Sequence, residues 1–270
     1  MTSLVRPKKF LGQHFLKDLE IARRIAGTIS DYSLPVLEVG PGTGVLTQFL
    51  LENDTDLTVV ELDRESVAYL KEHFPKLSGR IIEKDFLKLD LDTLFPEKFC
   101  VIGNYPYNIS SQIFFKVLDY KDKIPCCSGM IQKEVAERIA SGPGKKAFGI
   151  ISVLLQTWYD IEYLFTVDEH VFDPPPKVKS AVVRLKRNER LSLECDEKLF
   201  KTLVKTAFNQ RRKTLRNSLK PLLGKECPLY SLSIFDKRPE QLSVEQFIEL
   251  TKLAAEELKY QKQSSFSILS

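Results

Sequence analysis

A glycine-rich turn directly after a short apolar run is the feature that most restricts the fold of this 270-residue chain. The run Val36–Val39 leads into Gly40-Pro-Gly42-Thr-Gly44. Glycines at this spacing let the backbone turn sharply and approach a ligand without a Cβ atom in the way. Val45 stands where a dinucleotide-binding fingerprint has its third glycine. The turn therefore favours a smaller nucleoside over a pyrophosphate, and a plain tight turn is the alternative.

Apolar strands alternate with helical segments from about residue 35 onwards. The expected strands are 36–39, 57–62, 80–83, 99–103 and 128–132, followed by an antiparallel pair over 161–167 and 181–185. Ser110 and Ser111 are expected as N-caps of a helix over 112–118. Such alternation predicts a parallel sheet with helices on both faces.

The pattern changes near residue 186, and beyond Arg190 helical spacing replaces the strand signals. Phe200, Leu203 and Ala207 fall on one helical face, and Ser243 with Gln246 fits a capping box for a last helix. We therefore expect an α/β domain over 1–187, including an N-terminal arm, and a small all-helical domain over 188–270.

Positive charge is concentrated in one stretch. Residues 177–225 carry 15 Lys and Arg against four Asp and Glu, a net charge of +11, whereas the whole chain has +4. This stretch includes Arg211, Arg212, Lys213 and Arg216, and we expect Arg212 and Arg216 to lie one helical turn apart. Such a cluster can bind nucleic-acid phosphates, and a solvated helix start is the alternative.

Several classes of protein are excluded by composition. No apolar run approaches the roughly 18 residues that cross a bilayer. The five cysteines are odd in number and lack CxxC spacing, and there are only three histidines. We expect a cytoplasmic protein with reduced thiols, no metal site and no membrane association. Nothing in the sequence indicates an obligate dimer, so we expect a monomer.

Distinctive side chains follow the next expected strands. Glu61 ends the second strand, Asp85 follows the third and Asn104 follows the fourth. In an open α/β sheet, ligands bind at the carboxyl ends of the strands. Glu61 can accept both hydroxyls of a ribose there, and Asp85 can accept from an adenine amino group. A solvated loop carboxylate is the alternative for either acid alone.

The sharpest motif is Asn104-Tyr105-Pro106-Tyr107. An adenine amino group is a poor nucleophile because its lone pair is delocalised into the ring. The Asn104 side-chain oxygen and the Pro106 carbonyl could hold its two N–H groups and direct the lone pair at an electrophilic carbon. Tyr107 offers a face on which an extruded base can stack. A Pro-centred turn with two half-buried tyrosines is the alternative.

Taken together, these motifs resemble the S-adenosylmethionine-dependent methyltransferases, and most closely the KsgA-type ribosomal RNA small-subunit adenine dimethyltransferases. The resemblance runs nearly from end to end. It rests on KFLGQHFL at 9–16, LEVGPGTG at 37–44, Glu61, KDF at 84–86, GNYPYNIS at 103–110, VFDPPPKVKS at 171–180 and AFNQRRKTLR at 207–216. It implies a Rossmann-like methyltransferase domain with a small all-helical C-terminal domain.

The resemblance also implies which residues hold the cofactor, S-adenosyl-L-methionine, and its product, S-adenosyl-L-homocysteine. Glu61 would contact the ribose, Asp85 the adenine and Gly40 the amino-acid part. The full implied set is Gln13, His14 and Leu16 of the arm, Gly40 and Gly42 of the turn, and Glu61, Asp85, Phe86 and Asn104 near the strand ends.

The implied substrate is a pair of adjacent adenosines in the 3′-terminal hairpin loop of 16S rRNA in the 30S particle, each methylated twice at its 6-amino group. Asn104 and Pro106 would hold the amino group, and Tyr107 and Phe172 would stack on the base. The four basic residues Arg211, Arg212, Lys213 and Arg216 would contact rRNA phosphates. A role in small-subunit biogenesis is also implied.

Two positions differ from the usual family pattern. The family often has Asn where His14 stands, which leaves two alternatives for the cofactor contact there, the ring or the backbone. Tyr105 replaces a more usual Leu, and we expect it to face the core. Three alternatives remain open: a large-subunit rRNA adenine methyltransferase of the antibiotic-resistance type, a ribosome-assembly factor without catalysis, and a DNA amino-methyltransferase.

Overall fold

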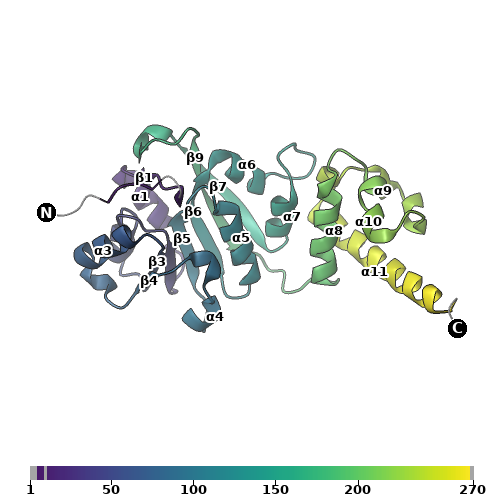
Figure 1. Cartoon of the computed structure of the whole chain (residues 1–270), viewed down its shortest axis with the longest axis horizontal. Coiled ribbons are helices and arrows are strands. Elements are labelled where there is room, and N and C mark those ends of the chain that lie inside the picture. Colours follow the sequence, from purple (N-terminus) through teal and green to yellow (C-terminus); the bar gives the residue numbers. More distant parts are fainter. Residues whose placement is uncertain (1–4, 9–10, 268–270) are drawn as a thin grey trace. The chain divides into compact units, whose positions relative to one another are not determined.

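A computed structural model describes residues 5–8 and 11–267, and its contacts divide the chain into two compact units. The first comprises the described residues up to Glu137 together with Tyr159–Asn188, and we call it the sheet unit. The second comprises Arg138–Trp158 and the described residues from Glu189 onwards, and we call it the helical unit (Figure 1). The domain boundary expected between residues 187 and 188 stays a prediction. The division by contacts differs from it because the helical unit also includes residues 138–158.

The sheet unit is built on a seven-stranded mixed sheet. Five parallel strands occupy one side and two antiparallel strands complete the other, so the pair expected from the sequence is confirmed. In spatial order the strands are β4 (Ile81–Glu83), β3 (Leu57–Glu61), β2 (Val36–Val39), β5 (Cys100–Asn104), β6 (Cys126–Gln132), β9 (Ser180–Arg187) and β7 (Tyr159–Val167).

The parallel strands β2, β3, β5 and β6 are buried on both faces, which explains their nearly continuous apolar sequence, whereas the edge strand β4 is only half-buried. On β2, Val36 packs with the cluster that includes helix residues Ala22, Ile25 and Phe49, whereas its neighbour Leu37 is fully buried on the opposite face. The packing of different residues on the two faces of β2 fixes the register of the strand, because a slip of one residue would exchange the side chains on the two faces.

Helices and short 3-10 turns connect the strands. The helices of this part are α1 (Leu19–Ala26), α2 (Thr47–Glu52), α3 (Arg64–His73), α4 (Leu91–Leu94), α5 (Ser110–Asp119) and α6 (Lys133–Ala140), the last running across the division between the units. The 3-10 turns are η2 (Gly27–Ile29), η3 (Pro75–Leu77), η4 (Phe86–Lys88) and η5 (Glu169–Val171).

The start of α5 differs from the sequence prediction. The helix begins at Ser110 itself and its N-cap is Ile109, so the expectation that Ser110 or Ser111 is the cap is wrong. The physical reason is the turn before it: the Ile109 N–H donates to the Pro106 carbonyl at 3.2 Å, and the chain runs from that turn directly into the helix. The Ser110 hydroxyl donates to the Tyr107 carbonyl instead, at 3.3 Å.

A second, two-stranded sheet lies outside the main one. β1 (Phe15–Leu16) pairs antiparallel with β8 (Phe172–Asp173), so that Leu16 faces Phe172. Both side chains are buried within the main core cluster. The pairing ties the N-terminal arm to the segment before β9.

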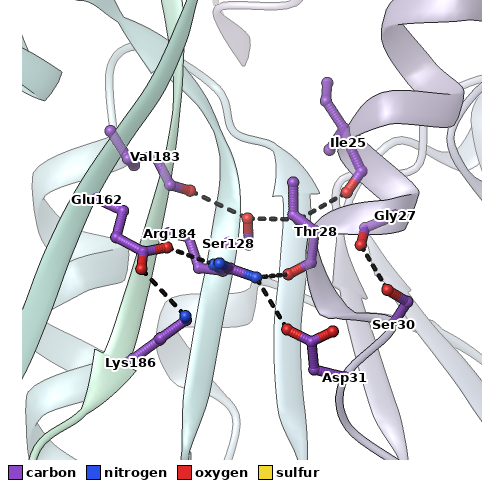
Figure 2. Close-up of polar contacts among 10 residues, drawn as sticks. All are labelled: Ile25, Gly27, Thr28, Ser30, Asp31, Ser128, Glu162, Val183, Arg184 and Lys186. Atoms are coloured by element: carbon purple, nitrogen blue, oxygen red, sulfur yellow. Dashed lines mark hydrogen bonds and ion pairs between the residues drawn. The ribbon is translucent and has the colours of Figure 1, made fainter.

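Polar side chains are also buried in the sheet unit, where α1 and η2 contact β6, the strand that pairs with β9 (Figure 2). Thr28 Oγ1 lies 2.6 Å from Ser128 Oγ, and the Ser128 hydroxyl donates to the Val183 carbonyl at 3.0 Å. Arg184 donates to the Thr28 carbonyl at 3.1 Å and to Glu162 at 2.7 Å. These bonds satisfy polar groups that would otherwise be costly to bury.

In its described residues the helical unit contains helices and no strand. They are α7 (Ile150–Gln156), α8 (Glu197–Asn209), α9 (Leu215–Ser218), α10 (Lys220–Leu223), α11 (Val244–Ser267) and the 3-10 turns η6 (Pro228–Ser231), η7 (Ser233–Asp236) and η8 (Pro239–Gln241). The expected capping box is confirmed, because Ser243 N–H donates to Gln246 Oε1 at 3.1 Å and Gln246 N–H donates to Ser243 Oγ at 3.2 Å.

Candidate active site

The carboxyl ends of β2, β3, β4 and β5 border one cavity of about 170 Å³. The structure brings together there most of the residues singled out from the sequence. They are Gln13, His14, Gly40, Gly42, Glu61, Asp85, Phe86, Asn104, Pro106 and Tyr107. The arm supplies one wall and the strand ends supply another, as expected for an open α/β sheet.

The glycine turn forms the part of the wall that follows β2. Gly40 and Gly42 have φ angles of 70° and 57°, a region that other residues rarely adopt. A Cβ on Gly42 would lie 2.9 Å from Cε1 of Phe15, so glycine is also needed for space. The Gly42 N–H donates to Oε2 of Glu61 at 3.1 Å, which joins the turn to the end of β3.

Glu61 is held by the backbone on both carboxylate oxygens. Its Oε1 accepts from the N–H groups of Leu62 and Asp63, each at 2.8 Å. Only 6% of the residue is exposed. Burial raises the pKa of Glu61 above its ordinary value, although the three backbone hydrogen bonds oppose the shift. The carboxylate is therefore fixed in one orientation, with lone pairs left over for a hydroxyl ligand.

Asp85 and Phe86 stand where β4 leads into η4. Oδ1 of Asp85 accepts from the Leu87 N–H at 2.9 Å and caps this turn, while the side chain is 30% exposed. Phe86 is buried beside it. The cavity thus has a carboxylate acceptor next to an apolar wall, an arrangement suited to a heterocyclic base.

A second buried acid lies behind the glycine turn. Glu38 is 1% exposed, and Oε2 accepts from the Thr47 hydroxyl at 2.7 Å. Burial raises its pKa to about 8. Glu38 borders a smaller cavity together with Gly40, Leu16 and Asn104. Glu38 was not predicted as a site residue, although a charged residue inside a short apolar strand is itself a signal of a special environment.

Asn104 is oriented by the arm. Its Nδ2 donates to the backbone carbonyl of His14 at 3.1 Å, and among the described residues no donor reaches its Oδ1. That oxygen is therefore left as an acceptor. Asn104 and Pro106 both line the cavity. The contact from His14 to Asn104 is made by its backbone carbonyl, whereas the cofactor contact expected at His14 stays a prediction.

The side chain of His14 makes two other contacts. Its ring stacks on Tyr107, with centroids 5.2 Å apart and planes inclined by 28°. Its Nδ1 lies 2.7 Å from the Pro174 carbonyl oxygen. The Tyr107 hydroxyl is hydrogen-bonded to Ser180 Oγ, and burial raises the pKa of the phenol, so Tyr107 is neutral at physiological pH. The Tyr107 ring is thus held by the hydrogen bond of its hydroxyl with Ser180 and by the His14 ring stacked on one of its faces.

Tyr105 faces the core, as predicted. It is 1% exposed, and its hydroxyl donates to the Ser128 carbonyl at 2.7 Å. Two glycines make room for the ring, because a Cβ on Gly103 or Gly129 would lie 2.9 Å or 2.7 Å from its carbons. The larger side chain at this position is therefore matched by small neighbours and a buried acceptor.

Two expected site residues do not reach the main cavity. Leu16 borders only the smaller cavity behind the turn. Phe172 is fully buried in the core cluster and lines neither of these cavities. As placed, the Phe172 ring offers no open face to a base, so its stacking role stays a prediction that requires the β1–β8 pair to open.

Other residues complete the main cavity without having been proposed as site residues from the sequence. They are Leu11, Gly12, Phe15, Val39, Val60, Leu62, Lys84, Leu87, Asn108 and Ile109, together with Tyr105, which was expected to face the core. Most are direct neighbours of motif residues, and that adjacency is the signal that could have identified them. Leu62 is notable because this apolar side chain is 52% exposed.

The basic residues belong to the helical unit. Arg212, Lys213 and Arg216 are exposed, and Arg211 is half-buried and donates to the Lys146 carbonyl. The expectation that Arg212 and Arg216 share a helical turn is wrong, because α8 ends at Asn209 and α9 begins only at Leu215. Arg216 pairs with Asp236 at 2.6 Å, which orders its guanidinium.

The described residues contain no group of three or more His, Cys, Asp or Glu side chains placed to hold a metal ion. Among the helices in the same part of the chain, none is both long enough and apolar enough to span a bilayer.

A family model described as "Ribosomal RNA adenine dimethylase" matches residues 5–256 of this chain. The chain belongs to this family. Among curated relatives, the protein named ribosomal RNA small subunit methyltransferase A from Parabacteroides distasonis is 75% identical over 259 residues, covering 96% of this chain and 97% of that protein. The protein of the same name from Bacteroides thetaiotaomicron is 68% identical, covering 95% of this chain and 97% of that protein.

Solved structures agree with the fold of an rRNA adenine dimethylase. A dimethyladenosine transferase from Plasmodium falciparum has a TM-score of 0.77 and 25% identity, covering 90% of this chain and 98% of that one. The 23S rRNA methyltransferase ErmE has a TM-score of 0.64 and 27% identity, covering 88% of this chain and 99% of that one. This dimethylase therefore has the Rossmann-like methyltransferase architecture with a helical C-terminal part.

Proposed function

We propose that this rRNA adenine dimethylase transfers methyl groups from S-adenosyl-L-methionine to the 6-amino groups of two adjacent adenosines in the 3′-terminal hairpin loop of 16S rRNA, within the 30S particle. It acts as a monomer in the cytoplasm, where ribosomes are assembled, and serves small-subunit biogenesis as well. The observation that carries the proposal is the oriented Asn104 side chain, whose Nδ2 is bound to the His14 carbonyl while Oδ1 remains an acceptor.

The walls of the cavity match the chemistry of this cofactor. Glu61 and Asp85 offer acceptors for ribose hydroxyls and an adenine amino group, and Leu62 with Phe86 offers apolar surface. Gly40 and Gly42 leave space for close approach. The residues that would hold it are Gln13, His14, Gly40, Gly42, Glu61, Asp85, Phe86 and Asn104, with Leu16 behind the turn. When bound, S-adenosylmethionine supplies a methyl group on a positively charged sulfur and leaves as S-adenosylhomocysteine.

The chain's own residues would prepare the amino group for attack. Asn104 Oδ1 and the Pro106 carbonyl are acceptors for its two N–H groups, which favours a pyramidal nitrogen with a directed lone pair. Tyr107, backed by His14, offers a platform for the extruded base. No general base of tuned pKa is required, because the amine becomes acidic on methylation and loses its proton to solvent. For the second methylation only one N–H remains to be held.

A large-subunit substrate is the second candidate, supported by the similarity to ErmE, a 23S rRNA methyltransferase. The small-subunit proposal has the stronger support, since the relatives that are 75% and 68% identical are both named for the small subunit.

Labelled methyl transfer to unmethylated 30S subunits tests the proposal, with 50S subunits and free 16S rRNA in parallel and Asn104→Ala as the matched variant. The expected result is up to four methyl groups per 30S particle, since each of the two adenosines is methylated twice, with almost none from the variant. Label on 50S material would favour the large-subunit candidate. Tight 30S binding without label would refute catalysis and leave an assembly factor.

A further inference from the structure

Lys8 connects the N-terminal arm to the start of α3. Its Nζ forms an ion pair with Asp63 and a second one with Glu65 Oε1 at 3.2 Å. The side chain of Asp63 is only 2% exposed, whereas that of Lys8 is 26% exposed. Asp63 is also the N-cap of α3 and accepts from the Ser66 hydroxyl at 3.0 Å. Lys8 therefore supplies the cationic partner of a carboxylate that is almost completely withdrawn from water.

The ion pair between Lys8 and Asp63 favours the charged form of both side chains. Burial is the largest single influence on the pKa of Asp63 and raises it, but the hydrogen bond and charge of Lys8, together with the hydrogen bonds from Ser66 and the Glu65 N–H, outweigh burial and lower the pKa. The hydrogen bond to Asp63 raises the pKa of Lys8. Both groups are therefore ionised throughout the physiological pH range.

Lys8 also organises the arm itself. Its backbone N–H donates to Gln13 Oε1 at 2.8 Å, and its carbonyl accepts from the Leu11 N–H at 3.0 Å. Leu11, Gly12 and Gln13 all line the main cavity. Lys8 thus helps to position this wall of the cavity.

Asp63 is in turn bound to the opposite wall, because its backbone N–H donates to Oε1 of Glu61 at 2.8 Å. A continuous series of polar contacts runs from Gln13 through Lys8 and Asp63 to Glu61. The ion pair is the one link in this series formed between two charged side chains. Breaking it would loosen the part of the arm before β1 without removing any residue that lines the cavity, while the β1–β8 pairing would still hold the rest of the arm.

We propose that Lys8 is a positioning residue that clamps the N-terminal arm over the cofactor cavity through Asp63, and that this ion pair limits the rate at which the cofactor and its product leave. The inference rests on the proposed function, since it takes S-adenosylmethionine and S-adenosylhomocysteine as the ligands of the cavity. Because Lys8 is partly exposed, added salt weakens the clamp.

The test measures the dissociation rate of labelled S-adenosylhomocysteine from the full-length protein by dilution into an excess of unlabelled ligand. Lys8→Met should dissociate about three- to tenfold faster, in line with the loss of one ion pair to a buried carboxylate. Lys8→Arg should restore the rate to near that of the wild type. Lys17→Met, which changes another exposed lysine of the arm, is the matched control and should leave the rate unchanged.

A double-mutant cycle separates positioning from general stability. Combining Lys8→Met with Asp63→Asn should accelerate dissociation little more than the faster single variant, because both changes remove the same contact. The wild-type rate should rise with salt concentration, and the Lys8→Met rate should not. A Lys8→Met protein with lowered thermal stability and an unchanged dissociation rate would overturn the inference. Failure of the wild type to bind S-adenosylhomocysteine would instead refute the proposed cofactor, and the inference with it.

Discussion

The side-chain amide of Asn104 donates to the backbone carbonyl of His14 at 3.1 Å, so the arm sets the direction of the residue most suited to bind the target amino group. We expect Asn104→Ala to lower the rate constant of methyl transfer about 100- to 1,000-fold, the usual effect of removing one oriented polar group at a reacting centre. Single-turnover transfer to 30S subunits measures this rate. Asn104→Asp should be similarly impaired, because a carboxylate next to the His14 carbonyl would be repelled from it.

His14 and Tyr107 form the stacked pair beside Asn104. His14→Ala should weaken binding of the RNA substrate about three- to tenfold, since an aromatic pair of this kind contributes about 1 kcal/mol. His14→Phe keeps the stack but not the Nδ1 contact with Pro174, and should bind RNA nearly as well as the wild type. Substrate dependence of the methylation rate provides the measurement. Equal losses in both variants would show that the Pro174 contact matters more than the stack.

Glu38 should make stability depend on pH. Its folded-state pKa of about 8 lies above its ordinary 4.5, so the folded protein binds the proton more tightly and loses stability as pH rises from about 5 to about 8. Glu38→Gln removes this titration. The free energy of unfolding of the variant relative to the wild type should therefore rise over this range by about 3 kcal/mol. Urea unfolding at several pH values measures the difference, and a difference independent of pH would contradict the prediction.

The buried contact between Thr28 and Ser128 should contribute to stability (Figure 2). Thr28→Val keeps the shape but removes the hydroxyl that donates to Ser128, and should lower the free energy of unfolding by about 1–2 kcal/mol. Ser128→Ala should cost at least as much, because it also leaves the Val183 carbonyl without its hydroxyl donor. Thermal or urea unfolding tests both variants. Additive losses in the double variant would argue against direct coupling.

The exposed side chain of Arg212 should contribute to the affinity for RNA and not to the rate constant of methyl transfer. Arg212→Gln should weaken 30S binding and reduce the slope of log affinity against log salt by about 0.7–0.9, the value for one lost phosphate contact. Lys198→Gln on α8 changes an exposed basic residue outside the cluster and serves as the control. Binding titrations at several salt concentrations give the slopes. Identical slopes for both variants would remove Arg212 from the RNA interface.

Local patterns in the sequence predicted the elements that depend on local chemistry. The strand Val36–Val39 forms with the expected bounds, and the Ser243–Gln246 capping box has both of its hydrogen bonds. The meeting of Glu61, Asp85 and Asn104 at one cavity could also be predicted, because parallel strands place their carboxyl ends at one edge.

Helix boundaries near turns were less predictable. Ser110 has the side chain of a good N-cap, yet the turn closed by Pro106 carries the chain into α5 one residue earlier. Likewise, the spacing of Arg212 and Arg216 suits one helix, but the chain leaves α8 at Asn209. In both cases the conformation of neighbouring residues overrides the intrinsic preference of the residue itself.

From the amino-acid sequence alone one can predict the succession of strands and helices, the glycine turn and the acceptors at the strand ends, because each depends on residues close together in the chain. The folded structure was needed to show that Leu16 pairs with Phe172, that Asn104 is oriented by His14 and that Lys8 is bound to Asp63. Such contacts join segments far apart in sequence, and they form only where the packing of the whole core offsets the entropy of closing the intervening chain.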